Sequence, residues 1–189
     1  MAQPKPDFSF DPTLTQFAVP MSTYLASHPS SPPHQAIATG ALVFAPDNKL
    51  LLVQRAPTDS SPNLWEVPGG GVDTSDATIL HAVAREVWEE SGLTVTHIKR
   101  SVPSAGEGPG PGRTFVTSRA LRVVKFEFEV EVEGGGEVKL DAREHQCFAW
   151  VCEEECREKR LKGGLGFEFT WRAQQESILE GFRLRKKGL

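Results

Sequence analysis

The sequence has 189 residues, of which 39% are hydrophobic and 24% charged, and a formal net charge of -4. This length suits one well-filled core, and the composition is that of an ordinary globular domain. The net charge argues against general affinity for nucleic acid, and no apolar run approaches the ~18 residues of a membrane span.

The N-terminal residues lack an apolar stretch behind a basic start, so we do not interpret them as a secretory signal. The three cysteines follow the spacing C-x4-C-x3-C, which matches neither a disulfide framework nor a familiar zinc site. We therefore expect free thiols and an intracellular, cytoplasmic protein.

Residues 1–33 are interpreted as an N-terminal extension that ends in a proline-rich linker, with a short helix within 21–28 capped by Ser22. Residues 34–189 are expected to form a single domain. Its first apolar runs, 36–46 and 50–57, are rich in strand formers and flank a turn-like 47–49, so they are predicted to pair.

A loop rich in proline and glycine over 60–76 precedes a predicted helix over 77–91, in which apolar residues recur with the helical period. Ser75 or Asp76 would cap this helix, and Gly92 would end it. Further strands are predicted over 93–102 and 146–151, with a mobile loop over 103–113 and helices over 152–160 and 170–186. Strands interleaved with helices indicate an α/β or α+β sandwich. The basic run 183–187 is interpreted as a solvated helix end.

The segment 120–134 alternates apolar and charged residues, which predicts a long, half-buried strand. One face carries Val124, Phe126, Phe128, Val130 and Val132, and the other carries Lys125, Glu127, Glu129 and Glu131. An edge of this strand can pair with a second copy of the chain, which keeps a homodimer open.

The predicted helix over 77–91 collects Glu86, Glu89 and Glu90 on one arc beside its apolar face. Carboxylates at the rim of a core are costly unless their charge is compensated, and oxygen ligands of this kind suit Mg²⁺ or Mn²⁺. The alternative is a solvated helix face on which Arg85 pairs with Glu89, and the helix alone does not decide between the two. Three glycines at 69–71 favour the metal site, because such a loop brings backbone groups close to a metal or a phosphate.

The segment "WEVPGGGVDTSDATILHAVAREVWEESGL" resembles the box of the Nudix hydrolases, G-x5-E-x7-R-E-U-x-E-E-x-G-U, where U is a bulky aliphatic residue. Its second half matches at every specified position, from Arg85 to Leu93. The first half departs from the box: with Gly70 as the first glycine, Asp76 stands where the box has glutamate, and one extra residue precedes Arg85. The box-like segment is thus Gly70–Leu93.

The resemblance implies a Nudix-like α/β/α sandwich with a mixed β-sheet. It also implies hydrolysis of a diphosphate linkage, in a nucleoside diphosphate derivative or a related soluble pyrophosphate, with Mg²⁺ or Mn²⁺ bound. The implied metal ligands are Gly70, Glu86, Glu89, Glu90 and, from outside the box, Glu144. Arg85 would hold the glutamates in position, and either Glu89 or Glu86 would be the general base.

Other residues have two interpretations each. His145, beside Glu144, is interpreted as a surface or core residue. The basic residues Arg113, Arg119, Arg122 and Lys125 hold phosphates or simply face solvent. Trp65 and Phe115 stack on a base or pack the core.

Two rival functions keep the fold. The first is a non-hydrolytic nucleotide-binding or regulatory module, which the intact glutamate cluster argues against. The second is an isomerase of prenyl diphosphates, which needs its own catalytic cysteine. Cys147 lies in a predicted strand and is a poor candidate for that role.

Overall fold

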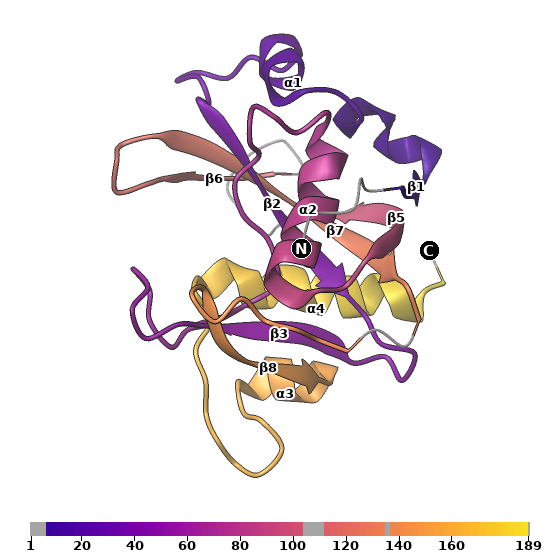
Figure 1. Cartoon of the computed structure of the whole chain (residues 1–189), viewed down its shortest axis with the longest axis vertical. Helices are drawn as coiled ribbons and strands as arrows, with labels where there is room; N and C mark the ends of the chain where they lie inside the picture. The colour runs from indigo at the N-terminus through magenta and orange to yellow at the C-terminus, as the bar shows by residue number, and fades with distance from the viewer. Residues whose placement is uncertain (1–6, 104–111, 135–136, 189) are drawn as a thin grey trace.

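The computed structural model describes residues 7–103, 112–134 and 137–188. Two β-sheets form the centre of the molecule, and helices cover them (Figure 1). The helices are η1 (Pro12–Phe17, a 3-10 helix), α1 (Met21–Ser27), α2 (Ile79–Ser91), α3 (Glu153–Glu158) and α4 (Arg172–Lys186). None of the helices in these ranges is long and apolar enough to cross a membrane.

The larger sheet has five strands and mixed directions. It contains β1 (Ser9–Phe10), β2 (Ala36–Val43), β5 (Val95–Val102), β6 (Arg113–Val116) and β7 (Arg122–Val132), in the order β1-β5-β7-β2 with β6 also paired to β7. Strand β2 runs parallel to β7 and β1 parallel to β5, whereas β5 and β6 run antiparallel to β7. The smaller sheet is antiparallel and contains β4 (Trp65–Glu66), β3 (Leu50–Arg55) and β8 (His145–Val151), in that order.

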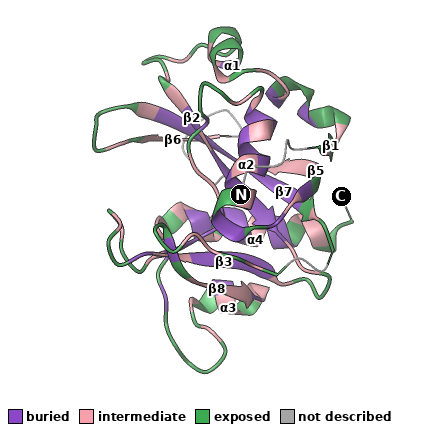
Figure 2. Ribbon diagram, in the orientation of Figure 1, coloured by how far each residue is buried: buried purple, intermediate pink, exposed green. Residues whose placement is uncertain are grey.

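Two buried clusters hold the layers together (Figure 2). The first lies between α2 and the larger sheet and includes Leu80, Val83 and Val87 of the helix, which recur at the helical spacing. In the second, Ile178 and Phe182 of α4 pack against residues of β2, β3 and β8. The α/β sandwich with a mixed sheet, predicted from the resemblance, is confirmed.

The N-terminal segment from Phe8 to Tyr24 packs on this sandwich. Phe17 is fully buried, and its ring lies 5.0 Å from that of Phe126 and 5.1 Å from that of Phe128. Helix α1 begins at Met21 after Pro20, so the predicted cap at Ser22 is wrong. The division of the chain at residue 33 stays a prediction.

The predicted pairing of the first two long strands is wrong for most of their length. Strand β2 pairs with β7 and β3 pairs with β8, and the two meet only at an isolated bridge between Phe44 and Leu50. The predicted loop at 103–113 lies mostly outside the described residues.

Strand β7 is buried on both faces from Val123 to Val130, which corrects the prediction of a solvent-facing charged side for all of its charged residues except the exposed Glu131. Lys125, Glu127 and Glu129 are 8%, 4% and 0% exposed. The cause is α4, which returns along the sheet: its Arg185 pairs with Glu129 at 2.6 Å, and Arg100 of β5 reaches the same carboxylate at 3.0 Å. The basic end of α4 is therefore not simply solvated.

Candidate active site

Helix α2 presents the three glutamates from a well-defined frame. It begins after Thr78, whose side chain accepts a backbone N–H of the first turn, and it ends at Gly92, whose φ is 68°. The predicted caps at 75 or 76 are therefore wrong, and the predicted end is confirmed. Glu86 and Glu90 are 8% and 5% exposed, whereas the side chain of Glu89 is 43% exposed. Two glutamates thus face the core rim and one faces solvent.

The glycine loop lies directly against these carboxylates. Gly69 has a φ of 152°, and its N–H donates to Glu90 Oε2 at 2.7 Å. A Cβ on Gly70 would lie 2.7 Å from Glu86 Oε1, closer than real Cβ atoms come to other heavy atoms. The Gly70 carbonyl accepts the N–H of Thr39 at 2.8 Å, which fixes the loop to β2. A side chain at Gly70 would therefore force the Glu86 carboxylate to move.

Arg85 joins the loop to the glutamates. Its Nε and Nη2 donate to the two carboxylate oxygens of Asp76, each at 2.9 Å. Its Nη1 donates to Glu86 Oε1 at 2.8 Å and to Glu89 Oε2 at 2.9 Å, and its Nη2 reaches the Gly71 carbonyl at 2.9 Å. The hydrogen bonds that Arg85 donates to Asp76 raise the pKa of Arg85, which therefore stays charged. Asp76 does not cap α2; it holds Arg85.

Negative charge at the site exceeds what its hydrogen bonds compensate. Burial raises the pKa of Glu90 well above its ordinary value, against the N–H of Gly69, and Glu86, Glu66 and Glu144 raise it further. Burial also raises the pKa of Glu86, with Glu144 again adding to the effect. Clustered, buried carboxylates with raised pKa values are the donor set that a divalent cation fits.

A second group, Glu66 with its partners, was missed by the sequence analysis. Arg55 donates to Glu66 Oε1 at 2.5 Å, Thr170 donates to Glu66 Oε2 at 3.1 Å, and His145 Nε2 lies 3.5 Å from Glu66 Oε1. Burial acts to raise the pKa of Glu66, but His145, Lys125 and Arg55 together hold it below its ordinary value. These residues come from four separate segments, and the one sequence signal was the place of Glu66 just before the glycine loop.

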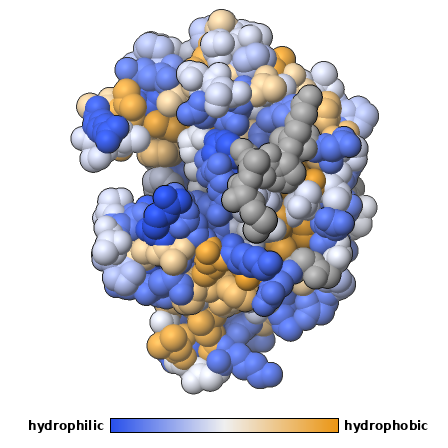
Figure 3. Space-filling model, viewed as in Figure 1, coloured by the Kyte–Doolittle hydropathy of each residue, from blue (hydrophilic) through white to orange (hydrophobic). Residues whose placement is uncertain are grey.

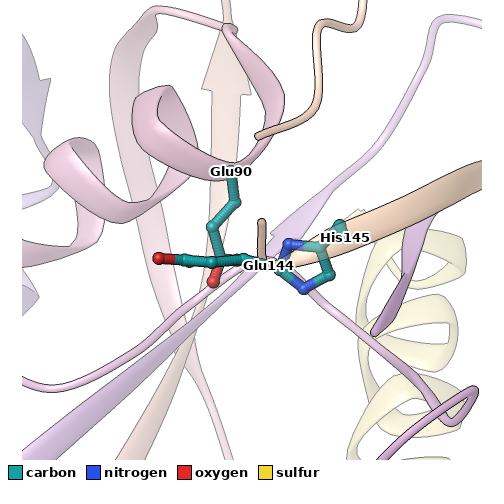
Figure 4. Close-up of side chains that lie close together, drawn as sticks. All are labelled: Glu90, Glu144 and His145. Atoms are coloured by element: carbon teal, nitrogen blue, oxygen red, sulfur yellow. The ribbon is translucent and has the colours of Figure 1, made fainter. Parts of the chain in front are cut away.

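Glu144 ends the segment 137–144 and His145 begins β8, and both residues lie beneath α2. Figure 4 shows the side chain of Glu90 extending from the helix toward Glu144 and the ring of His145. One ligand atom from each of these residues lies within 4.8 Å of those from the other two. Beside them is a cavity of about 650 Å³, lined by Trp88, Glu89, Lys139, Asp141, Arg143 and Glu144. The acidic cluster, which consists of Glu86, Glu89, Glu90 and Glu144, is therefore reachable from solvent through Glu89 and Glu144.

Where α4 packs on β7, buried polar side chains lack hydrogen-bond partners among the described residues. Glu127 is 4% exposed, and its Oε2 has no hydrogen-bond partner among the described residues. Gln174 of α4 is 1% exposed, and within the same ranges neither its amide nitrogen nor its amide oxygen has one. Burial raises the pKa of Glu127, while Lys125, a hydrogen bond from Ser177 and Arg113 act to lower it. Unpaired buried polar atoms cost ~1–3 kcal/mol each, so they mark a place where a partner is missing.

Aromatic and basic side chains surround this place. The Trp171 ring lies 4.7 Å from the Phe115 ring, and the guanidinium of Arg113 and the ammonium of Lys125 lie 4.4 and 5.6 Å from its centroid. Trp65, by contrast, is 4% exposed and packs against Phe167 in the core. Trp171 directly follows Thr170, whose hydroxyl donates to Glu66, so the chain connects this aromatic group to Glu66.

This chain is similar to known proteins in sequence and in fold. The sequence pattern of the NUDIX domain matches residues 34–166. A MutT-like protein from Streptomyces ambofaciens is 30% identical over 130 residues, which are 69% of this chain and 72% of that protein. The human m7GpppN-mRNA hydrolase NUDT17 is 43% identical over 58 residues, only 17% of its own length. The crystal structure of a MutT protein from Methanosarcina mazei is similar, with a TM-score of 0.57 and 26% identity over 80% of this chain and 95% of that one.

The matched range begins with the strand that holds the glycine loop and extends beyond the acidic cluster, so it contains the proposed site. The chain therefore belongs to the Nudix family and is a Nudix-type hydrolase.

Proposed function

We propose that this chain cleaves a diphosphate linkage in a nucleoside diphosphate derivative or a related soluble pyrophosphate, with Mg²⁺ or Mn²⁺ bound. The observation that carries the proposal is the burial of Glu86 and Glu90 against the glycine loop beside Glu144, where Arg85 and the Gly69 N–H compensate their negative charge only in part. A purely solvated helix face does not bury two glutamates out of three, so the alternative of an ordinary acidic face is disfavoured.

In this proposal the metal ligands are Glu86, Glu89, Glu90 and Glu144, with the second lone pair of the Gly70 carbonyl. A cation held by these residues would supply positive charge to the phosphate oxygens and to the leaving group. A carboxylate with access to water is also needed, to accept a proton from the water that attacks phosphorus. Glu89 suits this role better than Glu86, because its side chain is exposed and lines the cavity. Arg85 keeps both glutamates in place.

The nucleoside part of the proposal is supported by the group around Trp171. A planar ring can stack against Trp171 and Phe115, where Arg113 and Lys125 also lie over the Trp171 ring. Figure 3 shows a hollow in this face of the molecule between the β6–β7 hairpin and the loop that joins β3 to β4.

The rival functions have less support. A non-hydrolytic nucleotide-binding module needs no buried carboxylates that repel the phosphates it binds. The isomerase alternative needs a reactive cysteine, but burial raises the pKa of the Cys147 thiol, and its sulfur lies 3.0 Å from Gln54 Oε1.

A substrate panel tests the proposal: nucleotide sugars, dinucleotides, nucleoside triphosphates and inositol pyrophosphates, each with Mg²⁺, with Mn²⁺ and with chelator. Cation-dependent release of nucleoside monophosphate or phosphate is expected, with a loss of 100-fold or more in Glu89→Gln, on the order expected for a general base. Glu176→Gln, an exposed glutamate of α4, is the matched control and should keep full activity. Nucleotide binding without turnover, unchanged in Glu89→Gln, would favour the binding module.

A further inference from the structure

His145 has a buried imidazole ring whose nitrogens lack hydrogen-bond partners among the described residues. Its backbone N–H donates to the Asp141 carbonyl at 2.9 Å, which fixes the start of β8, and the residue is 3% exposed. Neither ring nitrogen has a hydrogen-bond partner of good geometry among the described residues, although Nε2 lies 3.5 Å from Glu66 Oε1. A buried ring in this state is costly unless something else binds it.

We propose that one ring nitrogen of His145 is a ligand of the divalent cation, together with Glu90 and Glu144. This rests on the proposed function only in requiring that a cation binds. Candidate ligand atoms of the three residues all lie within 4.8 Å of one another. Two ligands on opposite sides of one cation lie about 4.2 Å apart, since each bond is about 2.1 Å, so a small closure completes the site.

Glu66 then has a defined task. A histidine that binds a metal through one nitrogen commonly donates the other N–H to a carboxylate, which fixes the orientation and tautomer of the ring. Glu66 Oε1 lies 3.5 Å from Nε2 of His145, so in this proposal Nε2 carries the N–H and Nδ1 binds the cation. Glu66 is itself held by Arg55 and Thr170. The chain of contacts from Arg55 through Glu66 to His145 therefore ends at the cation.

A nitrogen ligand has a chemical consequence. Mg²⁺ strongly prefers oxygen ligands, whereas imidazole suits later first-row metals such as Zn²⁺, and affinity for sites that contain nitrogen is lowest for Mn²⁺ among these metals. A histidine ligand should therefore favour the transition metals over Mg²⁺, with Mn²⁺ gaining least among them. The competing interpretation is that His145 serves only as a partner of Glu66 inside the fold, in which case no nitrogen contacts the cation.

Pulsed electron paramagnetic resonance of the full chain loaded with Mn²⁺ distinguishes these cases, because a bound ¹⁴N modulates the electron spin echo. We expect modulation in the wild-type protein, replaced by the ¹⁵N pattern when histidine is labelled with ¹⁵N, a test that requires no mutation. The modulation should disappear in His145→Gln and remain in His97→Gln, which alters a partly buried histidine of β5. Calorimetry should show Mn²⁺ affinity falling ~10–100-fold in Glu66→Gln, the usual effect of losing such a partner, with a smaller loss for Mg²⁺.

Mn²⁺ binding without nitrogen modulation, or with modulation that survives in His145→Gln, would overturn the assignment. In that case, cation-dependent hydrolysis by the same preparation would leave the proposed function standing. If the chain bound no Mn²⁺ at all, both would fail.

Discussion

Asp76 gives the sharpest test of how the site is held together. Its side chain is 6% exposed and accepts two hydrogen bonds from Arg85, whose own side chain is 17% exposed. Asp76→Ala removes both bonds, together with a third that Asp76 Oδ2 accepts from the backbone N–H of Asp73 at 2.8 Å. It leaves a largely buried guanidinium with Glu86 and Glu89 as its remaining charged partners. Hydrogen bonds to charged groups contribute ~1.5–3 kcal/mol each to the free energy of unfolding. Because Arg85 keeps some of its charged partners, we expect the free energy of unfolding to fall by about 3 kcal/mol.

For a chain of this length, that loss corresponds to a fall in Tm of about 10 °C. Urea unfolding and thermal melts measure it, and Asp73→Ala is the matched control, because Asp73 lies in the same loop and accepts a backbone N–H of Ser75 instead. A double-mutant cycle with Arg85→Met should give a coupling energy of ~1–3 kcal/mol. If Asp76→Ala costs no more than Asp73→Ala and shows no coupling to Arg85, the assigned role of Asp76 is wrong.

Three further predictions concern other parts of the molecule. Gly70→Ala places a methyl group 2.7 Å from Glu86 Oε1, so Mn²⁺ affinity measured by calorimetry should fall at least ~10-fold, and unchanged affinity would contradict the geometry of the loop. Because burial raises the pKa of Glu127 in the folded state, its carboxyl contributes stability below its unfolded pKa that is lost as pH rises through the folded value. Glu127→Gln should therefore be more stable than wild type in urea at pH 7 and lose that advantage near pH 4, and an equal difference at both pH values would refute this. Phe17→Ala should cost ~3–5 kcal/mol of unfolding free energy, whereas a cost below ~1 kcal/mol would show that the N-terminal segment is not part of the core.

The elements predicted best are those that local spacing determines. Helix α2 shows its apolar period and its terminal Gly92 within 15 residues, and the glutamates follow from that register. Its cap was misplaced because Ser75, Asp76 and Thr78 are all good capping residues, and the choice depends on where the loop leaves the sheet. The roles assigned to Glu86, Glu89, Glu90, Gly70 and Glu144 stay predictions until a metal is observed.

What the sequence did not provide is long-range pairing. Nothing local to β2 indicates that its partner is β7 rather than the adjacent β3. The alternation along β7 predicts that one face of the strand is exposed to solvent. Helix α4, which comes from the far end of the chain, covers most of that face. Glu66 contacts Arg55, His145 and Thr170, which lie in different parts of the sequence. Only the fold brings these residues together, so no short motif could predict the contacts.

The carboxylate of Glu129 has a consequence for how the chain assembles. It is fully buried in β7, and its neutralising charges come from β5, through Arg100, and from the last turns of α4, through Arg185. A sheet formed before α4 docks carries a carboxylate with part of its counter-charge missing, a state that costs several kcal/mol when one partner of a buried pair is absent. The sheet and the final helix therefore gain stability together, and α4 should detach only as the whole domain unfolds, in one cooperative transition.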